Sequence, residues 1–146
     1  MSRTTSAAEY RALSEFRFLI RRYLTNTEKI AQSVAIEPQQ YIGLLTLRGL
    51  PDGQLPTIRN LADRLQIRHH SAVELVDRMQ RRGLIHRHRC ERDRRYVLVH
   101  LTPRGERLLG RLVQHRVSEL RMTGPALVSA LTGIIEGVPN RTPRRK

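Results

Sequence analysis

The feature that most constrains the fold of this chain is a change of hydrophobic period between residues 57 and 101. Two stretches first repeat apolar residues at the three- and four-residue steps of a helix. They are Ile58, Leu61, Ala62 and Leu65, then Ala72, Leu75, Val76 and Met79. Thr57 is suited to cap the first helix, and Gly83 is suited to the left-handed position that ends the second. Two short helices joined by a tight corner predict a helix-turn-helix.

After Gly83 the pattern repeats at every second residue, which is typical of β-strands. Residues 84–89 and 96–101 alternate β-branched, aromatic and charged side chains. The polar segment 90–95 between them has the composition of a hairpin loop. The sequence therefore predicts a β wing of two to three strands directly after the helix-turn-helix.

Amphipathic helices are predicted on both sides of this winged segment. An apolar stripe from Ala7 into the 30s predicts the first, and Pro38 suits the first turn of the next. That second helix is expected to bury Tyr41, Leu44, Leu45 and Leu47. Thr102-Pro103 begins a long helix that Gly124-Pro125 is expected to break, with a shorter helix continuing through Ile135. The predicted fold class is mainly α (α+β).

A large excess of positive charge points to a polyanionic partner. The 146 residues contain 27 Lys and Arg against 13 Asp and Glu, a net charge of +14, and only Lys29 and Lys146 are lysines. Nearly half of this excess lies in residues 78–95, where eight arginines accompany two acids. Guanidinium groups match phosphate oxygens and guanine edges. A solvated basic surface, or the base composition of the source genome, remains an alternative explanation.

Other compositional features narrow the class of protein. Four Tyr, two Phe and no Trp argue against an aromatic platform for single strands. A single cysteine excludes an intrachain disulfide and, with no secretory signal or apolar span, favours a cytoplasmic location. The sequence has no Gly-rich phosphate loop, no serine elbow and no pair of histidines at metal-binding spacing on a helix. We therefore predict that the protein is not an enzyme and binds no cofactor.

Histidines beside the only cysteine allow two further interpretations. His86 and His88 share a strand face with Cys90, which could supply three metal ligands, but structural zinc normally takes four. The simpler interpretation is that these histidines are polar side chains of the wing exposed to water, and we predict no metal site. Cys90 near arginines could have thiolate character, yet a disulfide switch would need a partner chain or a small thiol.

Residues 41–110 resemble the winged helix-turn-helix of MarR-type transcription regulators. The matching stretches are Ile58–Leu65, Leu75–Met79 with Arg82–Ile85, Asp93–Arg95, and Val99–Gly105, which contains the Leu-Thr-x-x-Gly pattern. The resemblance implies an N-terminal dimerisation arm (7–35), a DNA-binding lobe (36–101) and C-terminal dimerisation helices (102–137). The composition of the two ends predicts a disordered N-terminus (1–6) and a disordered basic tail (138–146).

The resemblance also implies a homodimer that binds double-stranded DNA, with recognition helices in major grooves and wings in minor grooves. In such proteins a wing Asp orients an inserted Arg, and here these would be Asp93 with Arg95 or Arg94. An internal salt bridge that only stiffens the hairpin is the alternative for this pair. Most such proteins are repressors, and some are released by a small-molecule effector.

Three groups of residues are the candidate DNA contacts. On the recognition helix they are Arg68, His69, His70, Ser71, Val73, Glu74 and Arg78. On the wing they are Arg89, Arg92, Asp93, Arg94 and Arg95, and weaker backbone contacts are Arg48, Arg59 and Arg64. The pair His69-His70 departs from the family pattern and could also be simple surface polarity. Glu74 is expected to accept from cytosine N4, and Val73 could touch a thymine methyl.

The predicted dimer interface lies on the two helical arms of the chain. The predicted interface residues are Phe16, Ile20, Leu112, Val117, Leu131 and Ile134. A competing function is that of a nucleic-acid-binding or nucleoid-architectural protein without sequence preference. Specific regulators typically prefer their site over random duplex by about a thousandfold or more, which distinguishes the two.

Overall fold

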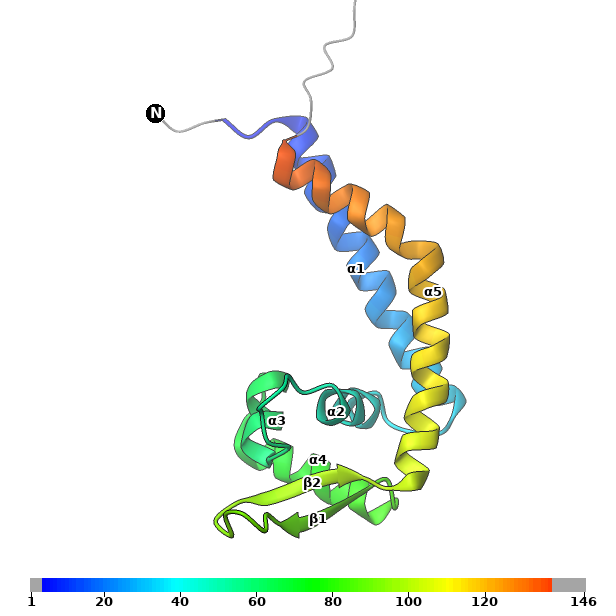
Figure 1. Cartoon of the computed structure of the whole chain (residues 1–146). Coiled ribbons are helices and arrows are strands. Elements are labelled where there is room, and N and C mark those ends of the chain that lie inside the picture. The colour runs from blue at the N-terminus through cyan, green and yellow to red at the C-terminus, as the bar shows by residue number, and fades with distance from the viewer. Residues whose placement is uncertain (1–3, 138–146) are drawn as a thin grey trace, which may run out of the picture. The chain divides into compact units, whose positions relative to one another are not determined.

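A computed structural model describes residues 4–137 of the chain (Figure 1). The elements are α1 (Ala7–Ser33), α2 (Pro38–Arg48), α3 (Ile58–Leu65), α4 (His69–Arg81), β1 (Ile85–Arg89), β2 (Val97–Leu101) and α5 (Pro103–Glu136). In this part of the chain the sheet has two antiparallel strands, which pair from Ile85 with Leu101 to Arg89 with Val97. The predicted mainly helical fold with a small wing is confirmed.

The chain divides into two compact units, and the division falls inside α1 and α5. One unit holds residues 28–114, and the other holds the residues up to 27 and from 115 onward. The predicted domain boundaries at residues 35 and 102 remain predictions. The predicted disordered tail, 138–146, and residues 1–3 of the predicted disordered N-terminus lie outside the described residues.

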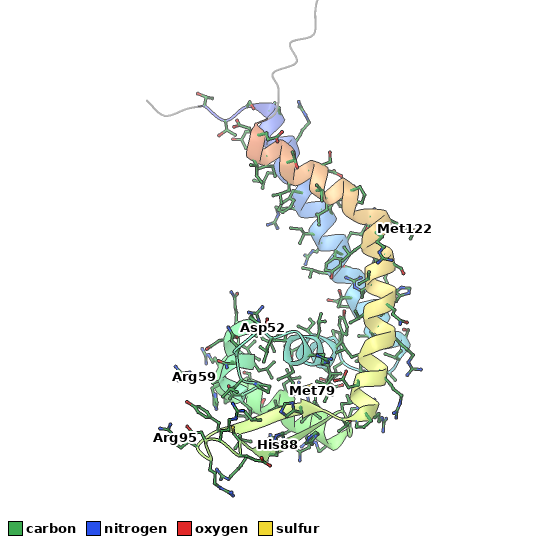
Figure 2. The ribbon with its side chains drawn as sticks, in the orientation of Figure 1. Asp52, Arg59, Met79, His88, Arg95 and Met122 are labelled. Atoms are coloured by element: carbon green, nitrogen blue, oxygen red, sulfur yellow. The ribbon has the colours of Figure 1, made fainter. Side chains whose placement is uncertain are left out.

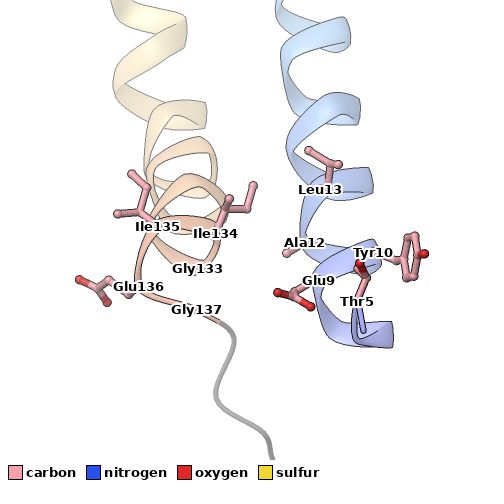
Figure 3. Close-up of a pocket in the computed structure, with 10 residues that line it drawn as sticks. All are labelled: Thr5, Glu9, Tyr10, Ala12, Leu13, Gly133, Ile134, Ile135, Glu136 and Gly137. Atoms are coloured by element: carbon pink, nitrogen blue, oxygen red, sulfur yellow. The ribbon is translucent and has the colours of Figure 1, made fainter. Parts of the chain in front are cut away.

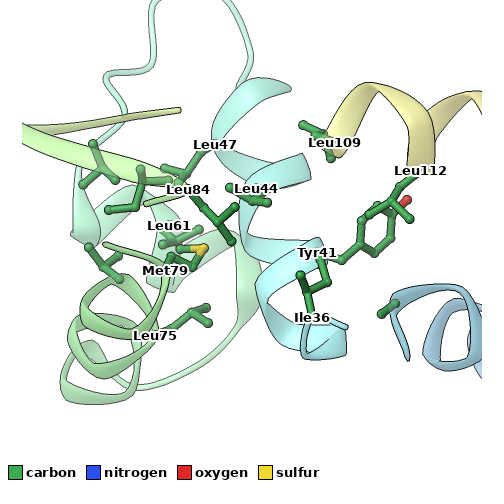
Figure 4. Close-up of a cluster of buried hydrophobic side chains, with 14 residues drawn as sticks. Ile36, Tyr41, Leu44, Leu47, Leu61, Leu75, Met79, Leu84, Leu109 and Leu112 are labelled. Atoms are coloured by element: carbon green, nitrogen blue, oxygen red, sulfur yellow. The ribbon is translucent and has the colours of Figure 1, made fainter. Parts of the chain in front are cut away.

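The core of the unit 28–114 gathers apolar side chains from all of its helices and both strands (Figure 4). Leu44 of α2, Leu61 of α3, and Leu75 and Met79 of α4 are at most 1% exposed. Each buried side chain of this size contributes about 1.5–3 kcal/mol through the hydrophobic effect. The apolar faces predicted for α3 and α4 thus hold the helix-turn-helix together.

Two leucines differ from their predicted positions, since one is more exposed and the other more buried than the sequence pattern indicates. The sequence predicts a buried Leu45, but Leu45 is 39% exposed because it lies beside the buried face of α2, whose apolar side chains are Tyr41, Leu44 and Leu47. Leu112 was expected at a dimer interface, but it is 3% exposed within a single chain. Leu112 packs beside Leu109 in the core of the unit 28–114, so the predicted interface role for Leu112 is wrong.

Side-chain caps begin several helices at the expected places. The Oγ1 of Thr57 accepts from the backbone N–H of Asn60 at 3.1 Å, as predicted, and Pro38 takes the first turn of α2. Ser6, in the segment predicted to be disordered, caps α1: its Oγ accepts from the N–H of Glu9 at 3.2 Å, and its own N–H donates to the Glu9 carboxylate at 2.7 Å. Gly83 has a φ of +69°, which confirms the left-handed residue after α4.

The start of α5 is fixed to the loop that follows α4. The Oγ1 of Thr102 donates to the carbonyl of Gly83 at 2.6 Å and accepts from the N–H of Gly105 at 3.1 Å. A Cβ built on Gly105 would lie 2.1 Å from the backbone oxygen of Leu84. The Leu-Thr-x-x-Gly pattern therefore has a steric cause, because only glycine fits where α5 passes this close.

The predicted break at Gly124-Pro125 is wrong, since α5 continues through Pro125 to Glu136. Proline removes one backbone hydrogen bond and crowds the preceding turn, which bends a helix without always ending it. Gly124 relieves part of the clash that normally disfavours helix before proline, because it has no Cβ. Figure 1 shows the ribbon changing direction in the gold segment of α5.

Within residues 4–137, none of the helices combines the length and the apolar character needed to cross a membrane.

Candidate nucleic-acid interface

The helix α4 presents its outer face from Arg68 onward. Gln66, with a φ of +54°, turns the chain sharply between α3 and α4. Because the opposite face packs into the core, the side chains of the candidate recognition residues lie outside. Arg68, His69, His70 and Glu74 are exposed, whereas Ser71 and Val73 are half-buried.

Within residues 4–137, Arg78 is the one predicted recognition residue that forms an ion pair. Its Nε lies 3.2 Å from Oε2 of Glu37, and the Arg78 side chain is 33% exposed. The Glu37 side chain also takes part in a capping box with Gln40 at the start of α2. Arg78 thus connects α4 to α2, and this connection competes with any contact to a phosphate.

At the tip of the wing, Asp93 holds Arg95 in place. Figure 2 shows Arg95 at this end of the wing. The Nε of Arg95 donates to both carboxylate oxygens of Asp93, at 2.9 and 3.1 Å, and Nη2 donates to Oδ2 at 2.6 Å. The backbone N–H of Arg95 donates to the same carboxylate at 3.1 Å. These bonds lower the pKa of Asp93, and the Asp93 carboxylate raises the pKa of Arg95.

The orientation of Arg95 leaves it available to a partner, because its side chain remains 83% exposed. Its guanidinium carbon lies 5.9 Å from the centre of the Tyr96 ring. The predicted pairing of Asp93 with a neighbouring arginine is present, with Arg95 in the paired position rather than Arg94. A solvent-exposed pair adds little to stability, so its main physical effect is to limit the directions that Arg95 can take.

The other wing arginines differ in how freely they can move. Nη1 of Arg89 donates to the carbonyl oxygen of Arg94 at 2.9 Å, which ties β1 to the loop. Arg92 and Arg94 have exposed side chains. The wing therefore combines a hairpin braced by Arg89 with several guanidinium groups at its tip.

A contact that the sequence did not predict anchors the wing to α4. Arg87 of β1 forms an ion pair with Asp77 and donates from Nη1 to the side chain of Gln80 at 2.7 Å. Arg87 lies on a strand, whose side chains alternate at every second residue, while Asp77 and Gln80 lie on the helix α4, whose side chains repeat at three- and four-residue steps. Only the packing of strand against helix brings the three together, so a one-dimensional pattern could not reveal them.

The predicted backbone contacts fall into two kinds. Arg48 is paired with Glu106, whose Oε1 lies 3.0 Å from the Arg48 Nε. Arg59 and Arg64 are exposed on α3, and Figure 2 shows Arg59 directed away from the core. The structure thus leaves Arg59 and Arg64 more accessible than Arg48 to a phosphate.

The histidines of the wing gather with a third that the sequence analysis did not include. The ring of His88 lies 4.7 Å from that of His100 in β2, and the ring of His86 lies 5.5 Å from that of His88. The half-buried Cys90 has a free thiol. Within residues 4–137, no group of three or more His, Cys, Asp or Glu side chains is arranged to hold a metal ion.

The unit formed by the two ends of the chain exposes many apolar side chains. Val117, Leu131 and Ile134 are 38–41% exposed, while Phe16 and Ile20 are half-buried. The first turns of α1 and the last turns of α5 line a hollow of about 720 Å³ (Figure 3). Its apolar lining includes Tyr10, Leu13, Ile134 and Ile135.

A buried arginine in the same unit was also missed by the sequence analysis. Arg116 is 3% exposed, and its Nη2 donates to Thr27 at 2.8 Å and to the carbonyl of Tyr23 at 3.0 Å. Its other partner is Glu119, one turn further along α5. Its guanidinium carbon also lies 3.9 Å from the centre of the Tyr23 ring. A single arginine thus joins α1 to α5, a connection that no periodic pattern could indicate.

The helix-turn-helix of α3 and α4, the two-stranded wing and the exposed arginines define a winged helix-turn-helix protein. Comparison with known proteins agrees with this class. Residues 36–95 match the sequence model of the MarR family. YsmB of Bacillus subtilis, described as an uncharacterized HTH-type transcriptional regulator, is 36% identical over 93 residues, a match that covers 64% of this chain and 62% of YsmB.

Solved structures extend the likeness to nearly the whole chain. AbsC, a MarR family transcriptional regulator from Streptomyces coelicolor, matches 92% of this chain and 94% of its own, with a TM-score of 0.71 and 21% identity. BpsR of Bordetella bronchiseptica, whose DNA binding is regulated by 6-hydroxynicotinic acid, matches 86% of this chain and 91% of its own, with a TM-score of 0.60 and 21% identity. At these identities the structural likeness bears on the fold.

The match to the MarR family model and the likeness to these proteins agree with the resemblance seen in the sequence. YsmB and AbsC, to which the chain is similar, are both described as transcriptional regulators.

Proposed function

We propose that this protein is a transcription regulator that binds double-stranded DNA in a sequence-specific way. The observation that carries the proposal is the exposed Arg95 held by Asp93 at the tip of the wing. A guanidinium with a limited range of directions loses less freedom when it enters a minor groove, and narrow minor grooves attract arginine. We also propose a cytosolic location, because a chain with a single cysteine needs no disulfide and the cytosol keeps thiols reduced.

The outer face of α4 is the element we propose for the major groove. A groove about 12 Å wide admits one helix, and the side chains at the N-terminal end of that helix meet the base edges. His69, His70 and Glu74 are the exposed groups there. Glu74 would favour cytosine by accepting from N4 and would disfavour a close phosphate.

The proposed assembly is a homodimer built by the two ends of the chain. The exposed Val117, Leu131 and Ile134 and the apolar hollow near them support this proposal, because such surfaces are usually covered. A two-fold axis would place two recognition helices one helical turn apart on DNA, about 34–36 Å.

We further propose that the regulator is a repressor and that a small molecule controls it. The regulation of BpsR by 6-hydroxynicotinic acid supports the second part by analogy. A ligand that prefers a dimer with misplaced recognition helices would lower the affinity for DNA by population shift.

The substitution Arg95→Ala tests the role of the wing. It should weaken binding to the operator at least about tenfold, the loss expected for a charge-assisted hydrogen bond of roughly 1.5–3 kcal/mol. Fluorescence anisotropy with a duplex from upstream of its own coding region gives the dissociation constant.

Arg104→Ala is the matched control for Arg95→Ala, because it removes the same charge from an exposed residue of the same unit. Its effect should be clearly smaller. Equal affinities for Arg95→Ala and the unmodified protein would remove the wing from the mechanism.

A further inference from the structure

Three histidines lie together on one face of the wing. His86 and His88 are two residues apart in β1, and His100 in β2 is the cross-strand partner of His86. The rings of His88 and His100 are stacked with their centres 4.7 Å apart and their planes 14° apart. His86 lies 5.5 Å from His88 and 6.1 Å from His100, so each ring lies near both of the others. We call these three residues the histidine cluster.

We propose that DNA binding by the wing is coupled to proton uptake at the histidine cluster. The inference rests on the proposed function, because DNA phosphates supply the negative charge that makes protonation favourable. The sequence suggested only metal binding or a solvated polar surface for His86 and His88, and their stacking with His100 points to a different use.

The arrangement of the rings favours an uncharged His100 in the free protein. Two imidazolium groups at this separation repel each other, and the repulsion is strongest where water is partly excluded. Burial lowers the pKa of His100, and His88 and His86 lower it further. A histidine whose pKa is lowered by folding makes the folded state less stable as the pH falls through the normal titration range of histidine.

The charged groups on the surrounding elements do not neutralise a charge on the cluster. Arg87 of β1 is paired with Asp77 of α4, and Arg48 of α2 is paired with Glu106 of α5. His100, Arg48 and Glu106 line one hollow of about 290 Å³. The helix α3, which packs against β2, carries the charged residues Arg59, Asp63 and Arg64. Among the described residues, the three histidines form no ion pair with a carboxylate, so the compensating anion has to come from outside.

A bound phosphate backbone reverses this preference, because its negative charge favours a protonated histidine over an uncharged one. The complex therefore binds more protons than the free components do. Affinity must then increase as the pH falls through the range in which the bound protein takes up those protons. Neutral pH lies close to this range for histidine, which makes the effect measurable under ordinary conditions.

The test is the dissociation constant of the full chain as a function of pH at constant ionic strength. The probes are a duplex from upstream of its own coding region and a random duplex of equal length. We expect binding to the first to be roughly tenfold tighter near pH 6 than near pH 7.5. A chelator in every sample keeps metal binding by the histidines from contributing.

Matched variants assign the effect to the cluster. The combined change His86→Gln, His88→Gln and His100→Gln should flatten most of the pH dependence. His115→Gln serves as the control, because it removes an exposed histidine that belongs neither to the cluster nor to the proposed DNA contacts. Its affinity and its pH dependence should both persist.

A single variant covers the case in which the triple variant does not fold. His88 is within 5.5 Å of both other rings, so His88→Gln alone should remove a large part of the dependence. Calorimetry of the unmodified protein in two buffers of different ionisation enthalpy measures the proton uptake directly.

The outcomes separate this inference from the proposed function. Tight binding with no proton uptake, or an unchanged pH dependence in His88→Gln and in the folded triple variant, overturns the inference alone. No binding to either duplex at any pH overturns the proposed function and the inference with it. A flattened curve in the cluster variants and a persistent one in the His115→Gln control support the inference.

Discussion

Single residues decide where the wing and α5 meet. Gly105 permits α5 to pass against the backbone oxygen of Leu84, and Thr102 joins the same loop through its hydroxyl. Gly83 supplies the left-handed backbone that turns the chain from α4 into β1. These residues were predictable from the sequence because each has a chemistry that few others share. The positions of Leu45 and Leu112 were not predictable, because a leucine in the sequence does not indicate which surface it packs against.

Gly105→Ala should destabilise the protein by about 1–3 kcal/mol, because the added methyl group collides with backbone that cannot move freely. Gly110→Ala is the control in the same helix, where a Cβ meets nothing within 4 Å. That change should be neutral or stabilising by about 0.5–1 kcal/mol, since alanine favours helix over glycine. Urea unfolding followed by circular dichroism measures both, and a Gly105→Ala protein as stable as Gly110→Ala would refute the steric account.

At the scale of elements, caps and hydrophobic period located most of the helices and both strands. Pro38, Thr57 and Thr102 mark helix starts because their side chains or rings satisfy the needs of a first turn. The continuation of α5 through Pro125 was not predictable, because a proline kink and a proline break have the same local sequence. The same limit applies to the candidate site. The charge pattern placed arginines on the wing, but the links from Arg87 to Asp77 and from His88 to His100 depend on packing between elements.

Arg116 provides a test of how α1 and α5 are joined. Arg116→Met removes one partner of a buried ion pair and leaves the Glu119 carboxylate without it, which should cost about 3 kcal/mol of stability. Adding Glu119→Gln removes the orphaned charge, so the double variant should recover part of that loss. Thermal unfolding measures both proteins. If the double variant is no more stable than Arg116→Met alone, the pairing is not what holds Arg116 there.

At the scale of the whole molecule, the account requires two copies of the chain. The apolar surface that supports this lies on the unit formed by the two ends, where Leu131 and Ile134 are 41% and 38% exposed. Leu112 belongs to the core of the other unit, so a charge at Leu112 would unfold the protein rather than separate two subunits. The oligomeric state therefore has to be tested at the exposed residues.

The combined substitution Leu131→Asp and Ile134→Asp should give folded monomers, because an interface would have to bury two carboxylates. Light scattering after size-exclusion chromatography gives the mass, and circular dichroism confirms the fold. Gln114→Asp adds a charge at an exposed polar residue of the same helix and should leave the dimer intact. Dimers that persist in the doubly substituted protein would place the interface elsewhere.

The most direct test of the central claim compares the dissociation constants for the duplex from upstream of its own coding region and for random duplex, at one salt concentration. Phosphate contacts alone treat both duplexes alike, whereas base contacts from α4 do not. The account predicts a preference of about a thousandfold or more for the upstream duplex. Nearly equal constants would contradict it and would identify a basic protein that coats DNA without reading its sequence.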